Sequence, residues 1–341
     1  MSSRWETTVQ ARRLGTRVIK KVFAAIALPL VMLGWASLFP ANAQTFPSRP
    51  VRMIVPFSPG GGTDVTVRLL AQALQEMWGQ SVVLDYLPGG ATVIATDAVA
   101  KALPDGYTMG VVISSHWINP SLRSSLPFDT VKDLSGVSTI ANSHLVLVAT
   151  PLLEANTLAE LIALAKKNPG KLTYASPGSG TGAHLAIELF KTMAGIDILH
   201  IPYKSGSSAY SDVFSGRVSL QIVLLQSHIS NIKSGKVKPI AITSARRAAG
   251  FADIPTFAET IPGFVVPSIN GIVVPSATPR NIVQKLSADI NKALQSPALI
   301  ERMEQMAMEP AGSTPEQFDA FIRSEIDKWA TVVKSSGAKA D

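Results

Sequence analysis

The chain contains no cysteine, and this absence excludes several kinds of structure and chemistry together. Without thiols it can form no disulfide, use no thiolate nucleophile and hold no metal through sulfur. A chain of 341 residues must then be stabilised by its apolar cores.

Motifs of metal sites and of common enzymes are also missing. The five histidines lack the spacing of a metal site, so we expect no metal and no cofactor; they are His116, His144, His184, His200 and His228. No P-loop lysine follows the glycines at 60–62, and no G-x-S-x-G elbow occurs. Gly178, Gly180 and Ala183 fit the dinucleotide fingerprint, but Asp197 precedes a strand where the ribose-binding acid should follow one. The sequence thus favours a protein that is not an enzyme.

The first 43 residues have the pattern of a targeting segment. They combine a basic start, an uncharged apolar run at 22–39 and a small-x-small site at 41–43, so we expect export with cleavage near Ala43. A retained membrane anchor is the alternative, because a run of 18 uncharged residues could just span a bilayer. Arg12-Arg13 leaves a twin-arginine route open beside general secretion.

Net charge is small once this segment is removed. The whole chain carries +7, of which residues 1–43 contribute +5, leaving about +2. A basic surface for nucleic acid is therefore not expected. The remaining length of about 300 residues exceeds one ordinary core and predicts two domains.

Short apolar runs alternate with amphipathic helical patterns, which predicts an α/β fold with mainly parallel sheets. The expected strands are 51–55, 82–84, 108–113, 145–148, 172–175, 198–201, 218–225, 239–243 and 269–274. Helices are expected at 65–78 before Gly79, after a capping box at Thr157 and Glu160, after a cap at Thr278, and after Thr314 with Gln317. The last helix has an apolar stripe that should point inward, formed by Phe318, Phe321, Ile322, Ile326 and Trp329.

The division into domains is predicted from the strand order, because no linker composition marks it. We place the crossings between the two domains near 143–145 and 267–270. Domain 1 would then be discontinuous, with residues 44–143 and 268–341, and domain 2 would hold residues 144–267.

Four turns between a strand and a helix consist of small residues, at 58–64, 88–92, 176–184 and 203–208. At the carboxyl ends of parallel strands, helix N-termini offer N–H donors and a positive dipole end to an anion. One such turn alone could be mere geometry, whereas four together predict a site for a carboxylate. The candidate binding residues are Ser58, Gly60, Gly61, Gly62, Thr63, Asp64, Ser176, Gly178, Ser179, Thr181 and His184.

Two further features each allow two interpretations. Asp64 either caps its helix or hydrogen-bonds a ligand hydroxyl or water. The run Ser114-Ser115-His116-Trp117 follows the strand at 108–113 and should face the cleft. There Trp117 either stacks on a planar ligand or packs under a loop.

Beyond these features, the sequence resembles the solute receptors of tripartite tricarboxylate transporters, the Bug-type periplasmic binding proteins. The segments that carry the likeness are 50–64, 104–108, 119–120, 127–133, 174–180, 184–186 and 202–204. The resemblance implies a periplasmic location and a type II periplasmic-binding-protein fold, with two α/β domains and a ligand cleft between them. It implies that a carboxylate is held by Ser58, Thr63, Asp64, Ser176, Gly178, Thr181, Tyr203 and Gly206.

Three positions depart from the family pattern. Tyr86-Leu87 stands where Asn-Arg is usual, Val93 where an Asn is common, and Val223 where an Asp is frequent. We therefore expect a less polar second wall of the cleft, which opens it to an aromatic or more apolar carboxylate beside the usual dicarboxylate.

Together these observations predict an exported binding protein that captures a small di-, tri- or aromatic carboxylate for uptake or sensing as its domains close. Its partners would be membrane transporter subunits or a sensor kinase. An exported enzyme that acts on a carboxylate or ester in the same cleft is the alternative, and a structural surface protein is a third class.

Overall fold

The computed structural model describes residues 46–336, so the targeting segment and its cleavage site lie outside the described residues. The strands are β1 (Val51–Val55), β2 (Val82–Tyr86), β3 (Thr108–Val112), β4 (Leu134–Ser143), β5 (Leu145–Ala149), β6 (Thr173–Ser176), β7 (Leu199–Pro202), β8 (Leu220–Leu224), β9 (Lys238–Ile242), β10 (Ser268–Pro275) and β11 (Glu309–Pro310). The α-helices are α2 (Gly62–Trp78), α3 (Val93–Ala100), α4 (Ser115–Leu122), α5 (Leu158–Lys167), α6 (Gly182–Ala194), α7 (Tyr210–Phe214), α8 (Ile229–Lys233), α9 (Arg280–Leu294), α10 (Pro297–Glu304) and α11 (Pro315–Ser336). None of the helices within 46–336 has both the length and the apolar composition that a bilayer crossing requires.

The strands described between residues 46 and 336 form two sheets. The first sheet has the order β11-β4-β10-β3-β1-β2, and the second has the order β7-β6-β8-β5-β9. Four pairings in this part of the chain are parallel and five are antiparallel, so the expectation of mainly parallel sheets is wrong. The antiparallel pairs involve the strands beside each crossing of the chain, because β10 returns between β3 and β4, and β5 enters between β8 and β9.

The long strand β4 was not predicted, because its sequence LSGVSTIANS has no continuous apolar run. It is nevertheless largely buried, with Val137, Ser138 and Ile140 fully covered. Small residues are required here, since a Cβ on Gly136 would lie 2.9 Å from Cδ1 of Phe318 in α11. The strand is thus specified by the helix that packs on it.

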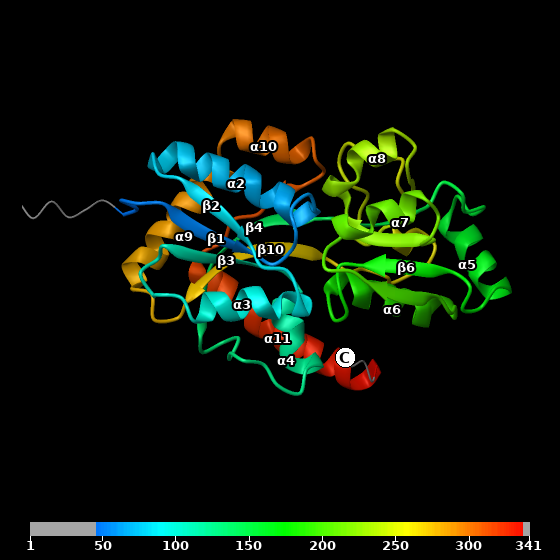
Figure 1. The fold of residues 1–341 in the computed structure, drawn as a ribbon, viewed down its shortest axis with the longest axis horizontal. Helices are drawn as coiled ribbons and strands as arrows, with labels where there is room; N and C mark the ends of the chain where they lie inside the picture. The colour runs from blue at the N-terminus through cyan, green and yellow to red at the C-terminus, as the bar shows by residue number, and fades with distance from the viewer. Residues whose placement is uncertain (1–45, 337–341) are drawn as a thin grey trace, which may run out of the picture. The chain divides into compact units, whose positions relative to one another are not determined.

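Helices cover both faces of the first sheet (Figure 1). One face packs on α3, α4 and α11, whose apolar side chains surround Ile54, Val112 and Val273. The predicted inward stripe of α11 is confirmed, because Phe318 and Ile322 are buried in this core. The first sheet with its helices, including α2, α9 and α10, is called the first lobe.

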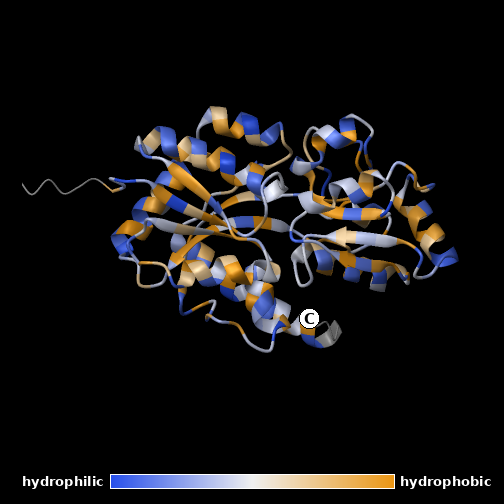
Figure 2. Ribbon diagram, viewed as in Figure 1, coloured by the Kyte–Doolittle hydropathy of each residue, from blue (hydrophilic) through white to orange (hydrophobic). Residues whose placement is uncertain are grey.

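The second sheet also packs on apolar cores at both faces, and in Figure 2 its strands mix segments in the hydrophobic colour with pale ones. Along β5, Leu145 and Leu147 join one core, while Val146 and Val148 join the core on the opposite face. Because successive side chains of a strand point to opposite faces and both faces are buried, every residue of β5 is apolar. The second sheet with α5 to α8 is called the second lobe.

Most predicted helix ends are confirmed. Gly79 ends α2 with a left-handed backbone (φ 63°), as a C-terminal glycine should. The hydroxyl of Thr157 accepts from the amide of Glu160 and starts α5, and Thr314 does the same for Gln317 in α11. The cap at Thr278 is wrong, because α9 begins after Pro279 without a side-chain cap.

The chain passes from the first sheet to the second between β4 and β5, and it returns between β9 and β10. The boundaries of the two domains at 143/144 and 267/268 stay a prediction.

Candidate ligand-binding site

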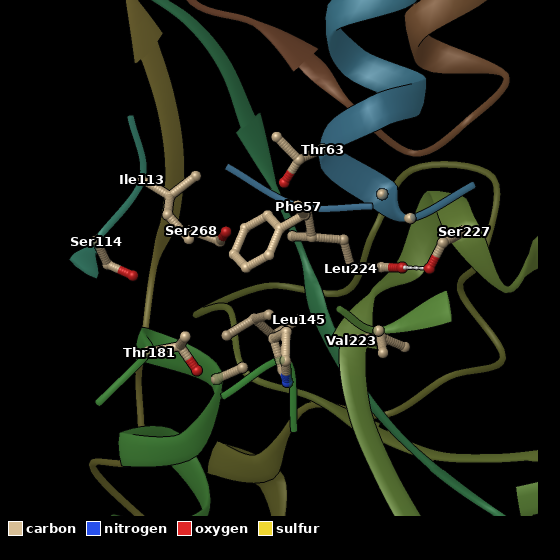
Figure 3. Close-up of a pocket in the computed structure, with 15 residues that line it drawn as sticks. Phe57, Thr63, Ile113, Ser114, Leu145, Thr181, Val223, Leu224, Ser227 and Ser268 are labelled. Atoms are coloured by element: carbon tan, nitrogen blue, oxygen red, sulfur yellow. Dashed lines mark hydrogen bonds between the residues drawn. The ribbon is translucent and has the colours of Figure 1, made fainter. Parts of the chain in front are cut away.

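A pocket with a cavity volume of about 50 Å³ lies where the two lobes meet. Turns and strand ends of both sheets contribute to it, as Figure 3 shows. Its lining consists of Phe57, Gly61, Gly62, Thr63, Ile113, Ser114, Leu145, Pro177, Thr181, Ala183, Gly206, Val223, Leu224, Ser227 and Ser268. None of these fifteen residues has a charged or titratable side chain.

The N-terminus of α2 opens into this pocket. Its N-cap is Gly61, which has no side chain to accept from the first amides, so the N–H groups of Gly62 and Thr63 lack a cap. The preceding Gly60 has a left-handed backbone (φ 82°), which turns the chain sharply into the helix. The first glycine turn therefore presents bare amides and the positive end of a 17-residue helix.

Asp64 lies in the first turn of α2 behind the pocket and is 4% exposed. It does not cap α2: its carboxylate accepts from the amide of Gly60 at 2.8 Å and from the hydroxyl of Tyr86 at 2.6 Å. Arg68 pairs with it from the solvent side at 2.9 Å. The role of Asp64 in these contacts is to hold the glycine turn in place.

Tyr86 completes this anchor from the end of β2. Burial, and next its hydrogen bond to the carboxylate of Asp64, raise the pKa of Tyr86 to about 12. The same carboxylate, mainly through its hydrogen bond, raises the pKa of Arg68. The phenol thus stays protonated and keeps donating to Asp64 at neutral pH.

The N-terminus of α6 meets the pocket from the second lobe. The hydroxyl of Thr181 caps this helix by accepting from the amide of His184, and it donates to the carbonyl of Gly178 at 2.8 Å. Thr181 and Ala183 line the pocket. Two helix N-termini from different lobes therefore point at one uncharged cavity, an arrangement suited to an anion.

A stack of aromatic rings lies behind this second turn. His184 and His200 lie 4.2 Å apart between ring centroids, and Tyr174 stacks on His200 at 4.8 Å. The hydroxyl of Ser176 lies 2.6 Å from Nε2 of His200 and is 1% exposed. Burial, and next the neighbouring His184, lower the pKa of His200 to about 4. Ser176 and His184 therefore support the turn and do not line the pocket.

Of the segment after β3, Ile113 and Ser114 line the pocket, whereas the next three residues are placed away from it. Ser115, His116 and Trp117 are all buried, and Trp117 packs edge-on against Phe321 of α11 at 5.3 Å. His116 lines a separate small cavity of about 10 Å³ beside Thr130 and Asp319. The position of Trp117 therefore agrees with the interpretation that its ring packs inside the protein, and not with stacking on a ligand.

A second, wider pocket of about 300 Å³ adjoins the first, since Phe57 and Pro177 line both. It contains the predicted residues Gly178, Ser179 and Tyr203. Of the other predicted residues, Gly61, Gly62, Thr63, Thr181 and Gly206 line the first pocket, whereas Ser58, Gly60 and Asp64 line neither. Ligand contact by any of these residues stays a prediction.

Several lining residues were missed by sequence reasoning. Leu145 and Leu224 form a wall from the second sheet together with Val223, which the sequence already placed in the cleft wall. Ser268 lies at a strand end of the first lobe, as does the predicted Ser114. The only signal available was position, because a residue that ends a strand beside a ligand-binding turn tends to face the same crevice.

The two lobes touch beside the pocket. The hydroxyl of Ser207 donates to the carbonyl of Pro59 at 3.0 Å, and the side-chain Nε2 of Gln226 donates to the carbonyl of Gly62 at 3.3 Å. A Cβ on Gly62 would lie 2.3 Å from Cβ of Leu224. The lobes are therefore in close contact around the cavity.

Comparison with known proteins adds independent findings. The sequence model of the tripartite tricarboxylate transporter family receptor matches residues 66–338. Protein BugT of Bordetella pertussis is 39% identical over 322 residues, which cover 94% of this chain and 98% of BugT. A protein of R. palustris solved with adipate is similar at 33% identity and a TM-score of 0.84, covering 87% of this chain and all of that one. The periplasmic binding protein BugD is similar at 31% identity and a TM-score of 0.83, with the same coverage.

Proposed function

Because the chain belongs to the receptor family of tripartite tricarboxylate transporters, we propose that it is a periplasmic receptor that binds a small organic carboxylate. The ligand is held between the two lobes, which act as two domains divided at 143/144 and 267/268. Ligand-induced closure then presents a surface to membrane transporter subunits or to a sensor. The protein binds and releases its ligand without a chemical step.

One observation supports this proposal most directly. The N-termini of α2 and α6 converge on a cavity whose lining holds no charged side chain. A carboxylate gains from both dipole ends and from bare amides there, whereas a cation would be repelled. The adipate in the similar R. palustris protein agrees with a carboxylate ligand.

The lobe arrangement supports closure. The chain passes between the sheets in two places, and the contacts between the lobes include single hydrogen bonds such as those donated by Ser207 and Gln226. A ligand that bonds to both lobes favours the closed form by its differential affinity alone.

Nothing in the geometry favours the enzyme alternative. Ser176 and His200 are at hydrogen-bond distance, as a nucleophile and its base would be. Ser176 is buried, however, and its hydroxyl is also 3.2 Å from the carbonyl of Gly178, outside the pocket lining. The hydrogen bond between Ser176 and His200 therefore supports the turn at 176–184.

Calorimetry with carboxylates and their primary amides tests the proposal. We expect micromolar or tighter binding of a carboxylate, no binding of the matching amide, and recovery of the ligand unchanged. Thr63→Ala, which removes a pocket hydroxyl, should weaken binding, whereas the control Thr260→Ala on an exposed surface should not. Binding of the neutral amide as tightly as the acid, or conversion of the ligand, would contradict the proposal.

A further inference from the structure

We propose that the wider pocket beside the first one is a second anion-binding site, in which Arg123 and Thr92 from the first lobe and Lys204 from the second hold an oxyanion. The oxyanion is either the second acidic group of a ligand whose carboxylate lies in the first pocket, or a separate inorganic anion such as phosphate. The first of these sources rests on the proposed function, whereas the second does not.

The lining of the wider pocket carries positive charge and no negative charge. Its charged side chains are those of Arg123 and Lys204, and no aspartate or glutamate contributes to it. Neither cation forms an ion pair within the part of the chain that the structure describes. The lining residue Tyr203 does bond to a carboxylate, that of Asp212, but Arg217 already pairs with it. An anion that enters this pocket therefore meets two unpaired cations from opposite lobes.

Thr92 adds a hydroxyl that has no partner. This residue is 2% exposed and lines the pocket, and its side chain neither caps α3 nor bonds to any other residue that the structure describes. Its oxygen is still accessible, unlike the sealed hydroxyls of Ser115 and Thr130. The hydroxyl can therefore donate to an anion in the pocket.

The turn that carries Thr92 is strained and is held from α4. Ala91 and Thr92 have left-handed backbones (φ 48° and 76°), which cost free energy in residues other than glycine. The side chain of Asn119 donates to the carbonyl of Ala91 at 2.9 Å, and the guanidinium of Arg123 donates to the carbonyl of Gly90 at 3.3 Å. The surrounding structure thus maintains a costly conformation that leaves the Thr92 hydroxyl free of its own helix, as functional turns often do.

The wider pocket is placed to share a ligand with the first. Phe57 of the first lobe and Pro177 of the second line both pockets. Its volume of about 300 Å³ has room for an oxyanion with several waters. Arg123 also borders a further surface hollow, but the carboxylate of Asp129 in that hollow is paired with Lys132.

Inorganic phosphate is the first probe, measured by calorimetry at neutral pH and low ionic strength. We expect saturable binding that Arg123→Gln and Lys204→Gln each weaken at least about 5-fold, because each removes a charge-assisted hydrogen bond. Thr92→Ala should weaken it by about 3-fold, and Thr92→Ser should restore it. The control Lys233→Gln changes an exposed lysine of α8 that lines neither pocket and should have no effect.

Two pairs of acids identify the source of the oxyanion: hexanoate with adipate, and benzoate with terephthalate. Within each pair a methyl group or a ring hydrogen is replaced by a carboxylate. If the ligand supplies the oxyanion, Arg123→Gln and Lys204→Gln should weaken the diacid at least about 10-fold and the monoacid less than about 3-fold. If an inorganic anion supplies it, phosphate should still bind in the presence of saturating monoacid, and both variants should abolish this.

Dependence on both cations is required in at least one of the two experiments. Because Arg123 also supports the turn at 88–92, Lys204→Gln tests the charge from the other lobe without touching that turn. Any other pattern, including dependence on Arg123 alone, overturns the inference.

The outcomes separate this inference from the proposed function. Carboxylate binding that depends on neither cation, without phosphate binding, overturns the second site and leaves the receptor in place. Phosphate binding that depends on both cations, without binding of any of the four acids, supports the second site and contradicts the proposed function.

Discussion

The contact between Gly62 and Leu224 allows a direct test of lobe closure. Gly62 starts α2 in the first lobe, and Leu224 ends β8 in the second. A Cβ at Gly62 would lie 2.3 Å from Cβ of Leu224, whereas ordinary contacts begin near 3.4 Å. The atom on the leucine side is fixed to the backbone and cannot rotate away. Gly62→Ala should therefore force the lobes apart by at least about 1 Å.

Two opposing effects decide what is measured. Overpacking of this kind costs about 1–3 kcal/mol, which corresponds to a loss of about 5- to 150-fold in ligand affinity if only the closed form suffers. In the open form the alanine favours the helix by up to about 1 kcal/mol. We therefore expect calorimetry to show at least about 5-fold weaker carboxylate binding, while the melting temperature of the ligand-free protein stays equal or rises.

Second-site variants sharpen the reasoning. Leu224→Ala keeps the offending Cβ and should not rescue Gly62→Ala, whereas Leu224→Gly should, when each is corrected for its single-variant effect. Gly182→Ala should be milder, because the nearest atom there is the hydroxyl of Ser114, which can rotate away. Unchanged affinity in Gly62→Ala with a normal circular dichroism spectrum would refute the closure argument. A large fall in melting temperature would show instead that Gly62 is required for the stability of the first lobe.

Three other predictions concern the anchor, the first turn and pH. Tyr86→Phe removes the donor to buried Asp64 and should lower the free energy of unfolding in urea by about 1–2 kcal/mol, with the ligand Kd changed less than about 3-fold; a larger change in Kd would mean that the phenol touches the ligand. Gly61→Val should block ligand approach and abolish binding with the fold intact, and calorimetry showing an unaltered Kd would contradict this. Burial lowers the pKa of His116 to about 4 from its ordinary 6.5, so between these values the unfolded chain binds the extra proton and stability falls as pH falls. Through His116 alone, lowering the pH from 7.5 to 5.0 should cost about 2 kcal/mol in urea unfolding. His116→Leu should remove that part of the slope, and an unaltered slope would refute the assignment.

Features that depend on neighbours along the chain were predictable from the sequence. The capping pair Thr314 and Gln317, the glycine that ends α2 and the stripe of α11 each rest on contacts within a few residues. The glycine turns belong to this class as well, because a strand followed by small residues and a helix fixes where bare amides will lie. The position of two helix N-termini at one pocket follows from these local signals and the sheet order.

Features that depend on distant packing were not predictable. Strand β4 is buried because α9 and α11 cover it. Its own sequence, with serines and a glycine, lacks the alternating apolar pattern that indicates a strand. Whether His116 faces a crevice or a core depends on how α4 sits against α11, which is separated from it by almost 200 residues. Trp117 was equally ambiguous for the same reason.

Glycine illustrates why a sequence can locate a site and still mislead about its parts. Gly61 and Gly62 are adjacent in a turn that was predicted to bring backbone close to a ligand. A side chain at Gly61 would meet only the carbonyl of Ser58 at 3.8 Å, so the space beside it is open to the pocket. A side chain at Gly62 would collide with the opposite lobe. We therefore expect both positions to require glycine, Gly61 for ligand approach and Gly62 for closure, and separate substitution of each distinguishes the two requirements.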